Sequence, residues 1–186
     1  MLMCMRLVGT VLILAIAVMA APGLHRAGAA SPQGIDPDVE AALKTLYQKV
    51  PAAKTLGGQA KGILVFPKIA KAGFIVGAQY GEGELLKDGQ VAGSYNMAAA
   101  SYGLQAGVQG FAYAMFFMTD SALNSLENSA GFEIGVGPSI VVVDAGKAKT
   151  LTTTTGRADV YAFIFGQKGL MGGLGLQGSK ITKVNR

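Results

Sequence analysis

Apolar residues first recur at helical spacing near the start of the chain, between Asp36 and Pro51. From residue 39 to residue 50 they stand three and four positions apart, which places them on one face of a helix. Asp36 is a typical N-cap residue, and Pro37 suits the first helical position, where the N–H has no helical partner. The pattern predicts an amphipathic helix that Pro51 ends, followed by a short second helix that Gly57-Gly58 ends.

Beyond residue 60 the apolar residues form short runs separated by glycine and polar residues, which is typical of β-strands. Pro67 has no N–H to donate to a neighbouring strand, so we expect it to end the first run. Asp88-Gly89 predicts a hairpin turn. Residues 111–118 fit a buried helix as well as a strand by periodicity, and their aromatic content favours a strand. The expected strands cover residues 63–66, 73–86, 91–101, 103–118, 132–143, 160–165 and 170–180, and we expect Pro138 to break the strand at 132–143.

The order of these elements predicts an α+β fold. We expect a curled antiparallel β-sheet of six to eight strands. The N-terminal amphipathic helix and a short helix near residues 120–129, capped by Thr119-Asp120, should pack on this sheet. We see no boundary within residues 36–186, so we expect one domain, preceded by a flexible lead at residues 31–35.

Residues 1–30 have the pattern of a secretory signal peptide. Arg6 precedes an apolar run of about 15 residues, and Ala27-Gly28-Ala29 follows as a candidate cleavage site, with a second candidate after Ala20. The run is shorter than the roughly 20 residues of a spanning helix, which favours cleavage over an uncleaved membrane anchor. We therefore expect a periplasmic or secreted protein that can associate with the cell envelope.

Cleavage after Ala29 would remove Cys4 and His25, the only cysteine and histidine of the chain. The mature chain could then form no disulfide, Cys/His zinc site, thiol nucleophile or histidine-based triad. We expect no metal and no cofactor. Loss of Arg6 and Arg26 also lowers the formal net charge from +5 to +3. That charge is too mild to indicate a nucleic-acid partner.

Two patterns that resemble catalytic or cofactor sites lack the context that such sites need. Residues 173–178 match G-x-G-x-x-G, but no acidic residue follows them, as a dinucleotide site requires. Glu82 and Glu84 would share one face of a strand, yet they lie beside a hairpin among glycines, where a solvated edge is the ordinary explanation. We therefore expect that the protein is not an enzyme.

The lysines of the N-terminal half are the main candidate for a binding surface. No acidic residue occurs between Glu40 and Glu82. An amphipathic helix followed by basic loops can bind anionic lipid headgroups, although a solvated face with extended lysine side chains is the commoner arrangement. The candidate lipid-binding residues are Lys44, Lys49, Lys54, Lys61, Lys68 and Lys71.

Glycines recur four positions apart in three segments of the chain. On a strand, positions i and i+4 point to the same face, so each pair presents a patch without side chains. Another backbone, a helix or an acyl chain could approach there, and tight packing between strands explains the pattern equally well. The close-approach candidates are Gly73, Gly77, Gly103, Gly107, Gly169 and Gly173.

Five segments taken in order resemble the SYLF domain family, a lipid-binding module also found in yeast and animal SH3-containing actin-patch proteins. They are AKGILVFP at 60–67, KAGFIVG at 71–77, SYGLQAGVQ at 101–109, FMTDSAL at 117–123 and the glycine-rich stretch 166–178. The resemblance covers residues 39–181, nearly all of the mature chain. Around the third strand the family often has aromatic residues, including Trp, whereas this chain has Tyr95-Asn96-Met97 and no Trp.

The resemblance implies a non-enzymatic lipid-binding domain. Eukaryotic relatives bind phosphoinositides, and some bind actin. The leader indicates export from a bacterial-type cell, which makes actin an unlikely partner. The basic N-terminal region of the family corresponds here to residues 44–71. We therefore expect an exported SYLF-type module that binds anionic phospholipid or a membrane surface at the cell envelope.

Two alternatives remain open from the sequence. One is a structural envelope protein whose glycine faces serve self-association. The other is a small outer-membrane β-barrel, which the leader and the glycine-rich strands suggest. The consecutive apolar residues at 74–76 and 114–118 speak against the second alternative, because a membrane barrel needs alternation along each strand.

Overall fold

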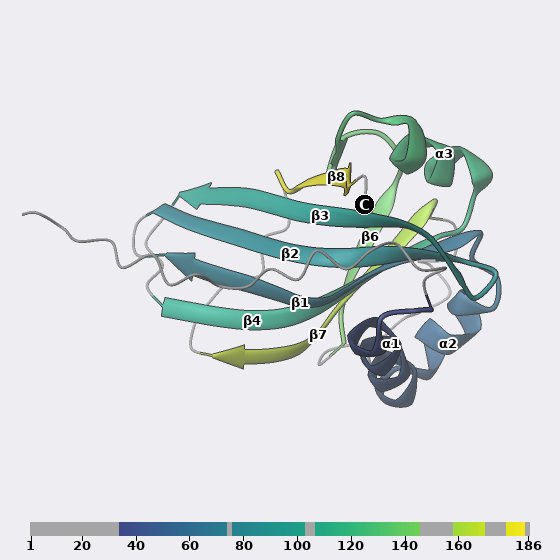
Figure 1. Ribbon diagram of the computed structural model, residues 1–186, viewed down its shortest axis with the longest axis horizontal. Helices are drawn as coiled ribbons and strands as arrows, with labels where there is room; N and C mark the ends of the chain where they lie inside the picture. Colours follow the sequence, from purple (N-terminus) through teal and green to yellow (C-terminus); the bar gives the residue numbers. More distant parts are fainter. Residues whose placement is uncertain (1–33, 74–75, 103–106, 146–157, 170–177, 185–186) are drawn as a thin grey trace, which may run out of the picture.

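A single eight-stranded sheet carries the fold in the computed structural model, which describes residues 34–73, 76–102, 107–145, 158–169 and 178–184. The strand order is β5-β8-β3-β2-β1-β4-β7-β6 (Figure 1). The strands are β1 Gly62–Gly73, β2 Val76–Lys87, β3 Gln90–Tyr102, β4 Gly107–Phe117, β5 Phe132–Glu133, β6 Ile140–Asp144, β7 Val160–Gly169 and β8 Lys180–Val184. The predicted α+β class with a curled sheet is confirmed, and β6 and β7 run parallel where we expected antiparallel pairing throughout.

Three helices occur in the described residues: α1 Pro37–Lys49, α2 Pro51–Gly57 and α3 Asp120–Asn128. The Asp36 carboxylate accepts a hydrogen bond from the N–H of Asp38 at 2.8 Å, and Thr119 Oγ1 accepts one from the N–H of Ala122 at 3.2 Å. Both predicted N-caps are thus confirmed. None of these helices is long and apolar enough to cross a membrane, over the part of the chain that the structure describes.

The hairpin between β2 and β3 has the predicted turn. Asp88 and Gly89 take φ values of 51° and 74°, as the two central residues of a type I′ turn require. This turn fixes a long register in which Lys87 pairs with Gln90 and Val76 with Tyr102. The two strands therefore extend side by side well beyond the helices (Figure 1).

Pro67 does not end its strand, so that prediction is wrong. β1 continues to Gly73, and the ladder is interrupted instead. The register of β1 shifts between Val65 and Lys68 against β2, and between Phe66 and Ile69 against β4. Because Pro67 cannot donate to either neighbour, the strand bulges at this point and then resumes pairing. Gly73 accordingly ends β1 rather than beginning the next strand.

Residues 132–143 form two separate strands, whereas we expected one strand with a break at Pro138. β5 and β6 lie at opposite edges of the sheet, with Pro138 between them in sequence. Residues 111–118, which were ambiguous by periodicity, lie almost entirely in β4. Of the expected strands, residues 74–75, 103–106 and 170–177 lie outside the described residues.

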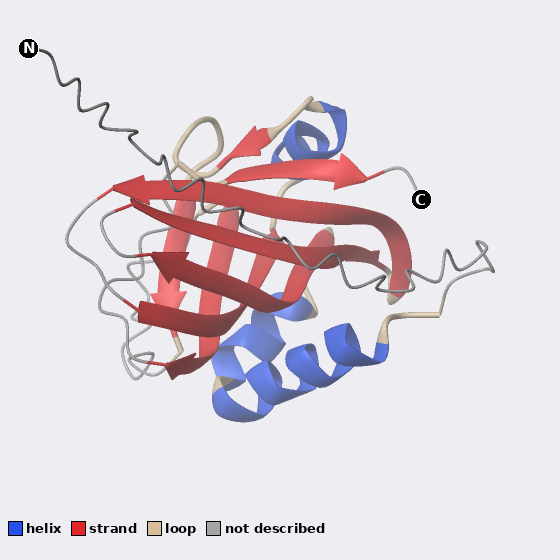
Figure 2. Ribbon diagram, turned by 60° about the vertical axis from the view of Figure 1, so that its left-hand side comes forward, coloured by secondary structure: helices blue, strands red, loops and turns tan. Residues whose placement is uncertain are grey.

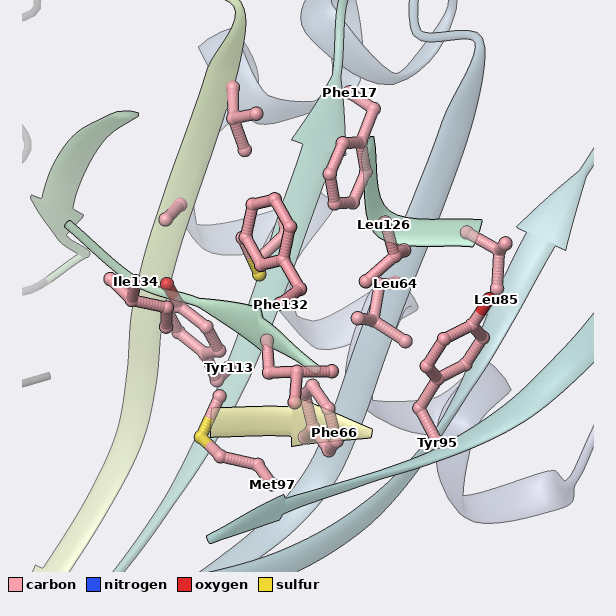
Figure 3. Packing of buried hydrophobic residues seen from close by; sticks show 14 of the residues in the cluster. Leu64, Phe66, Leu85, Tyr95, Met97, Tyr113, Phe117, Leu126, Phe132 and Ile134 are labelled. Atoms are coloured by element: carbon pink, nitrogen blue, oxygen red, sulfur yellow. The ribbon is translucent and has the colours of Figure 1, made fainter. Parts of the chain in front are cut away.

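Where the sheet lies against the helices, both of its faces are covered, each by a different helical element. The α3 face carries a core of side chains from α3 and most strands, including Phe66, Tyr95 and Tyr113 (Figure 3). The α1 face packs against α1 and α2, which lie along one side of the sheet (Figure 2), through residues such as Leu46 and Phe116. Two covered faces explain the continuous apolar run in β4, since neither face there meets water.

Candidate functional site

A groove of about 490 Å³ lies between α1 and the α1 face of the sheet. This volume falls within the roughly 300–1,000 Å³ range of small-molecule sites. The residues that line it come from α1 on one side and from β1, β4 and β7 on the other: Asp38, Ala41, Ala42, Thr45, Pro67, Lys68, Gly110, Phe111, Ala112, Phe165, Gly166 and Lys168.

The groove lies where the strand ladders are interrupted. β1 shifts register between Phe66 and Ile69, and the β4–β7 ladder shifts between Gly110 and Ala112. Gly166 adds a residue at φ 66° in β7, a conformation that glycine adopts without strain. Small side chains from α1 and β4 then leave the space unfilled. The interrupted ladders and the small side chains together account for the groove at this point.

Two lysines and one carboxylate line this groove. Lys68 belongs to β1 and Lys168 to β7, and both are exposed. Asp38, in the first turn of α1, is also exposed. Glu82 lies opposite Lys68 in the β1–β2 register. The lining thus holds two ammonium groups against one carboxylate, which favours a ligand with negative charge.

Sequence reasoning missed Lys168. It is far from the other candidate lysines along the chain, and only the β4–β7 register, which places it opposite Gly110, brings it to the groove. The lysine itself carried no local signal, because an isolated lysine in a strand is normally a solvated residue. Pairing of β7 with β4 would have had to be known first.

The six predicted lipid-binding lysines do not form one cluster. Lys44, Lys49 and Lys54 are exposed on α1 and α2, and Lys68 lines the groove. Lys61 lies directly before β1, about 20 Å from Lys68 at the rise of an extended strand. There its ammonium group lies 3.9 Å from the Asp120 carboxylate.

Lys71 lies inside the protein, where its side chain is only 4% exposed. It follows Ile69 by two positions and therefore points to the α3 face. It lies opposite Gln79 on β2 and Gln109 on β4, both buried, and Gln79 donates a hydrogen bond to Ser179 Oγ at 2.8 Å. This residue accordingly lies apart from the exposed lysines.

Three of the six predicted close-approach glycines lie side by side. Gly73 is opposite Gly77 on β2 and opposite Gly107 on β4. A Cβ atom at Gly73 would clash with the backbone of Gly77, so this contact accounts for the glycine through tight strand packing. Gly169 ends β7 opposite Gln109. The remaining two, Gly103 and Gly173, lie outside the described residues.

Glu82 and Glu84, the two carboxylates considered above as a possible catalytic pair, both accept hydrogen bonds within the protein. Glu84 accepts a hydrogen bond from the N–H of Asp36 at 3.1 Å, which ties the start of α1 to β2. Glu82 accepts one from the Tyr80 hydroxyl at 2.8 Å. Within the described ranges, no three acidic, histidine or cysteine side chains gather closely enough to hold a metal ion.

Asp159 is the carboxylate with the most hydrogen bonds described. It accepts from the Ser139 hydroxyl at 2.7 Å, from the Ser139 N–H at 3.1 Å and from the Thr119 hydroxyl at 3.5 Å. These bonds lower the pKa of Asp159, the Ser139 hydroxyl most of all. The network joins the start of β6 to the start of β7 and the cap of α3, which is a structural role.

Part of the chain matches a known protein family. Residues 98–186 match the family described as Ysc84: Las17-binding protein actin regulator. This segment, 89 of the 186 residues, is therefore similar to the SYLF family. This match confirms the resemblance that the sequence motifs indicated. The SYLF domains are binding domains, and no curated protein matches the chain.

The matched segment begins in β3 and includes β4, α3, β7 and β8. It therefore contains Lys168 and the β4 wall of the groove. α1 and Lys68 lie before the matched segment. The groove is thus built from both the matched and the preceding part of the chain.

Proposed function

We propose that this protein is an exported, non-enzymatic module that binds anionic phospholipid at the cell envelope. The observation that carries the proposal is the meeting of Lys68 and Lys168 in one groove beneath an amphipathic helix. The SYLF match supports a binding role. The leader supports export.

The headgroup phosphate would lie between the two lysines of the groove. Each Lys near an anionic membrane surface contributes about 1 kcal/mol to binding. Lys49 falls on the same side of α1 as the lining residues Ala42 and Thr45, because it follows them by seven and four positions. The proposal therefore centres on Lys49, Lys68 and Lys168, and Lys44 and Lys54 add to the attraction at longer range.

The family description names Las17 binding and actin regulation. Export would separate this chain from cytoplasmic actin, so we propose the lipid and not actin as its partner. Self-association remains the alternative function, and it would give an oligomer in the absence of lipid.

Co-sedimentation with vesicles tests the proposal. The purified protein should sediment with anionic vesicles at low salt and not with neutral vesicles. At high salt it should dissociate from the anionic vesicles, because ions screen exposed charges. Lys68→Gln combined with Lys168→Gln should weaken binding about thirtyfold, from two contributions of about 1 kcal/mol.

The matched control combines Lys61→Gln with Lys183→Gln. This variant also loses two positive charges, from exposed lysines that do not line the groove. It should bind nearly as well as the wild type. Equal weakening in both double variants would mean that only net charge matters. Absence of wild-type binding to anionic vesicles would refute the proposed function.

A further inference from the structure

Among the described residues, no helix or loop covers one face of the sheet at the strand ends beyond the groove. α1 and α2 pack on the α1 face of β1, β4 and β7 only as far as the interrupted ladder. Beyond it, the far ends of β1–β4 extend away from the helices (Figure 1). Val76, Tyr80 and Val108 are 63%, 50% and 68% exposed there. Among the described residues, the other exposed large apolar side chains are Val136 and Val142, at 66% and 47%.

The strand register places these side chains on one face. Val108 lies opposite Ala72, which lies opposite Ala78, and Val76 and Tyr80 stand two positions to either side of Ala78. The alanines between them are also exposed. We call this surface the uncovered face, made of Ala70, Ala72, Val76, Ala78, Tyr80 and Val108. None of its members is charged.

Lysines stand at both ends of one cross-strand row of this face. The row crosses six strands through the residues Lys180, Ala98, Tyr80, Ala70, Gly110 and Lys168. Lys68 stands two positions before Ala70 on β1. The Tyr80 ring is half exposed, and its hydroxyl bonds to Glu82 at the border of the face. Apolar side chains bordered by lysines, with a tyrosine at the boundary, match the layers of a bilayer interface.

We propose that the uncovered face enters the acyl-chain region of an anionic membrane while Lys68 and Lys168 stay at the phosphates. This inference rests on the proposed function and adds a depth and an orientation to it. From Lys68 to Ala72 the strand rises about 13 Å. That distance suits a surface whose apolar side enters the headgroup and acyl boundary by roughly 5–10 Å. The cationic border selects an anionic bilayer as the occupant of this face.

A single tryptophan can report this depth, because the natural chain has none. Val108→Trp should show a blue-shifted emission on anionic vesicles and strong quenching by lipids brominated in their acyl chains. The control is Val136→Trp, at a site of equal exposure, 66%, beside β5. Its emission should remain that of a water-exposed indole, with little quenching.

A second pair of substitutions measures the contribution to affinity. Val76→Ala and Val108→Ala each remove two carbon atoms from the membrane-facing side chains. At full insertion each should weaken vesicle binding about tenfold, and salt sensitivity should persist. Because both sites are exposed, the variants should fold as the wild type does, which thermal unfolding would check.

Three outcomes would overturn the inference, and they can be told apart. If Val108→Trp binds anionic vesicles but its emission is not quenched, the face does not insert. The proposed function would then hold without this inference. Loss of all wild-type binding would remove both proposals. A blue shift before lipid is added, together with a dimer mass, would show that a second copy of the chain covers this face.

Discussion

The two halves of the α1 face differ in what covers them. Near the helices, Phe116 is fully buried and packs against Tyr47 and Phe163, with ring centroids 6.3 and 5.4 Å away. On the same face of the same strand, Val108 is 68% exposed. The apolar character continues across both halves, whereas the helical cover stops at the groove. One half therefore serves stability, and the other is available for binding.

The largest expected effect comes from comparing Phe116→Ala with Val108→Ala. Truncation of a buried phenylalanine costs about 3–5 kcal/mol, so Phe116→Ala should lower the free energy of unfolding by that amount. Val108→Ala should change it by less than about 0.5 kcal/mol, as most surface substitutions do. Urea unfolding of both variants measures the two values. Similar losses would mean that the far half is also covered.

Close packing between β1 and β2 gives the next largest effect. A Cβ atom at Gly83 would clash with the backbone carbonyl of Val65. Gly83→Ala should therefore cost about 2–3 kcal/mol, as overpacking of a strand contact does. Gly34→Ala is the control, because a Cβ atom there meets nothing within 4 Å. If both changes were neutral in chemical unfolding, the close approach of β1 and β2 at Gly83 would be wrong.

A buried hydroxyl on the α3 face gives a smaller effect of the opposite sign. Tyr113 is fully buried, its hydroxyl has no hydrogen-bond partner in the described structure, and burial raises its pKa. Tyr113→Phe should raise the free energy of unfolding by about 1 kcal/mol, because it removes a desolvated polar group. A clear loss of stability would show that the hydroxyl is bonded in solution.

The smallest effect concerns the Asp159 network and its pH dependence. Hydrogen bonds from Ser139 and Thr119 lower the pKa of Asp159 in the folded state. A lowered pKa contributes stability that is complete above the unfolded value and is lost as the pH falls through the folded value. Asp159→Asn should thus be slightly less stable than the wild type at pH 7. The gap in melting temperature should close toward pH 3, and a gap that stays constant would contradict this.

The sequence predicted the local elements better than their arrangement. Caps such as Asp36 and Thr119 and the Asp88-Gly89 turn were correct, because these signals act within a few residues. The prediction that Pro67 ends a strand was wrong. Its missing N–H produced a bulge instead, because β1 is paired with a strand on each side and resumes pairing after it. Pro138 was expected to break one strand, but it separates two strands at opposite edges of the sheet.

The candidate site depended on information that no local pattern contains. Lys68 was predicted because it lies in a basic segment, while Lys168 reaches the groove only through the β4–β7 register. Lys71 belongs to the same basic segment, yet strand alternation after the bulge turns it to the α3 face. A charge cluster in sequence became a cluster in space only where the sheet topology allowed it.

Charge reversal at the groove tests the central claim most directly. Lys68→Glu with Lys168→Glu should abolish binding to anionic vesicles, because two attractive groups become repulsive. Lys61→Glu with Lys183→Glu changes the net charge equally and should retain binding within a few-fold of the wild type. Vesicle co-sedimentation of the two folded variants at one low salt concentration gives the answer. Equal loss in both would contradict a lipid site at the groove.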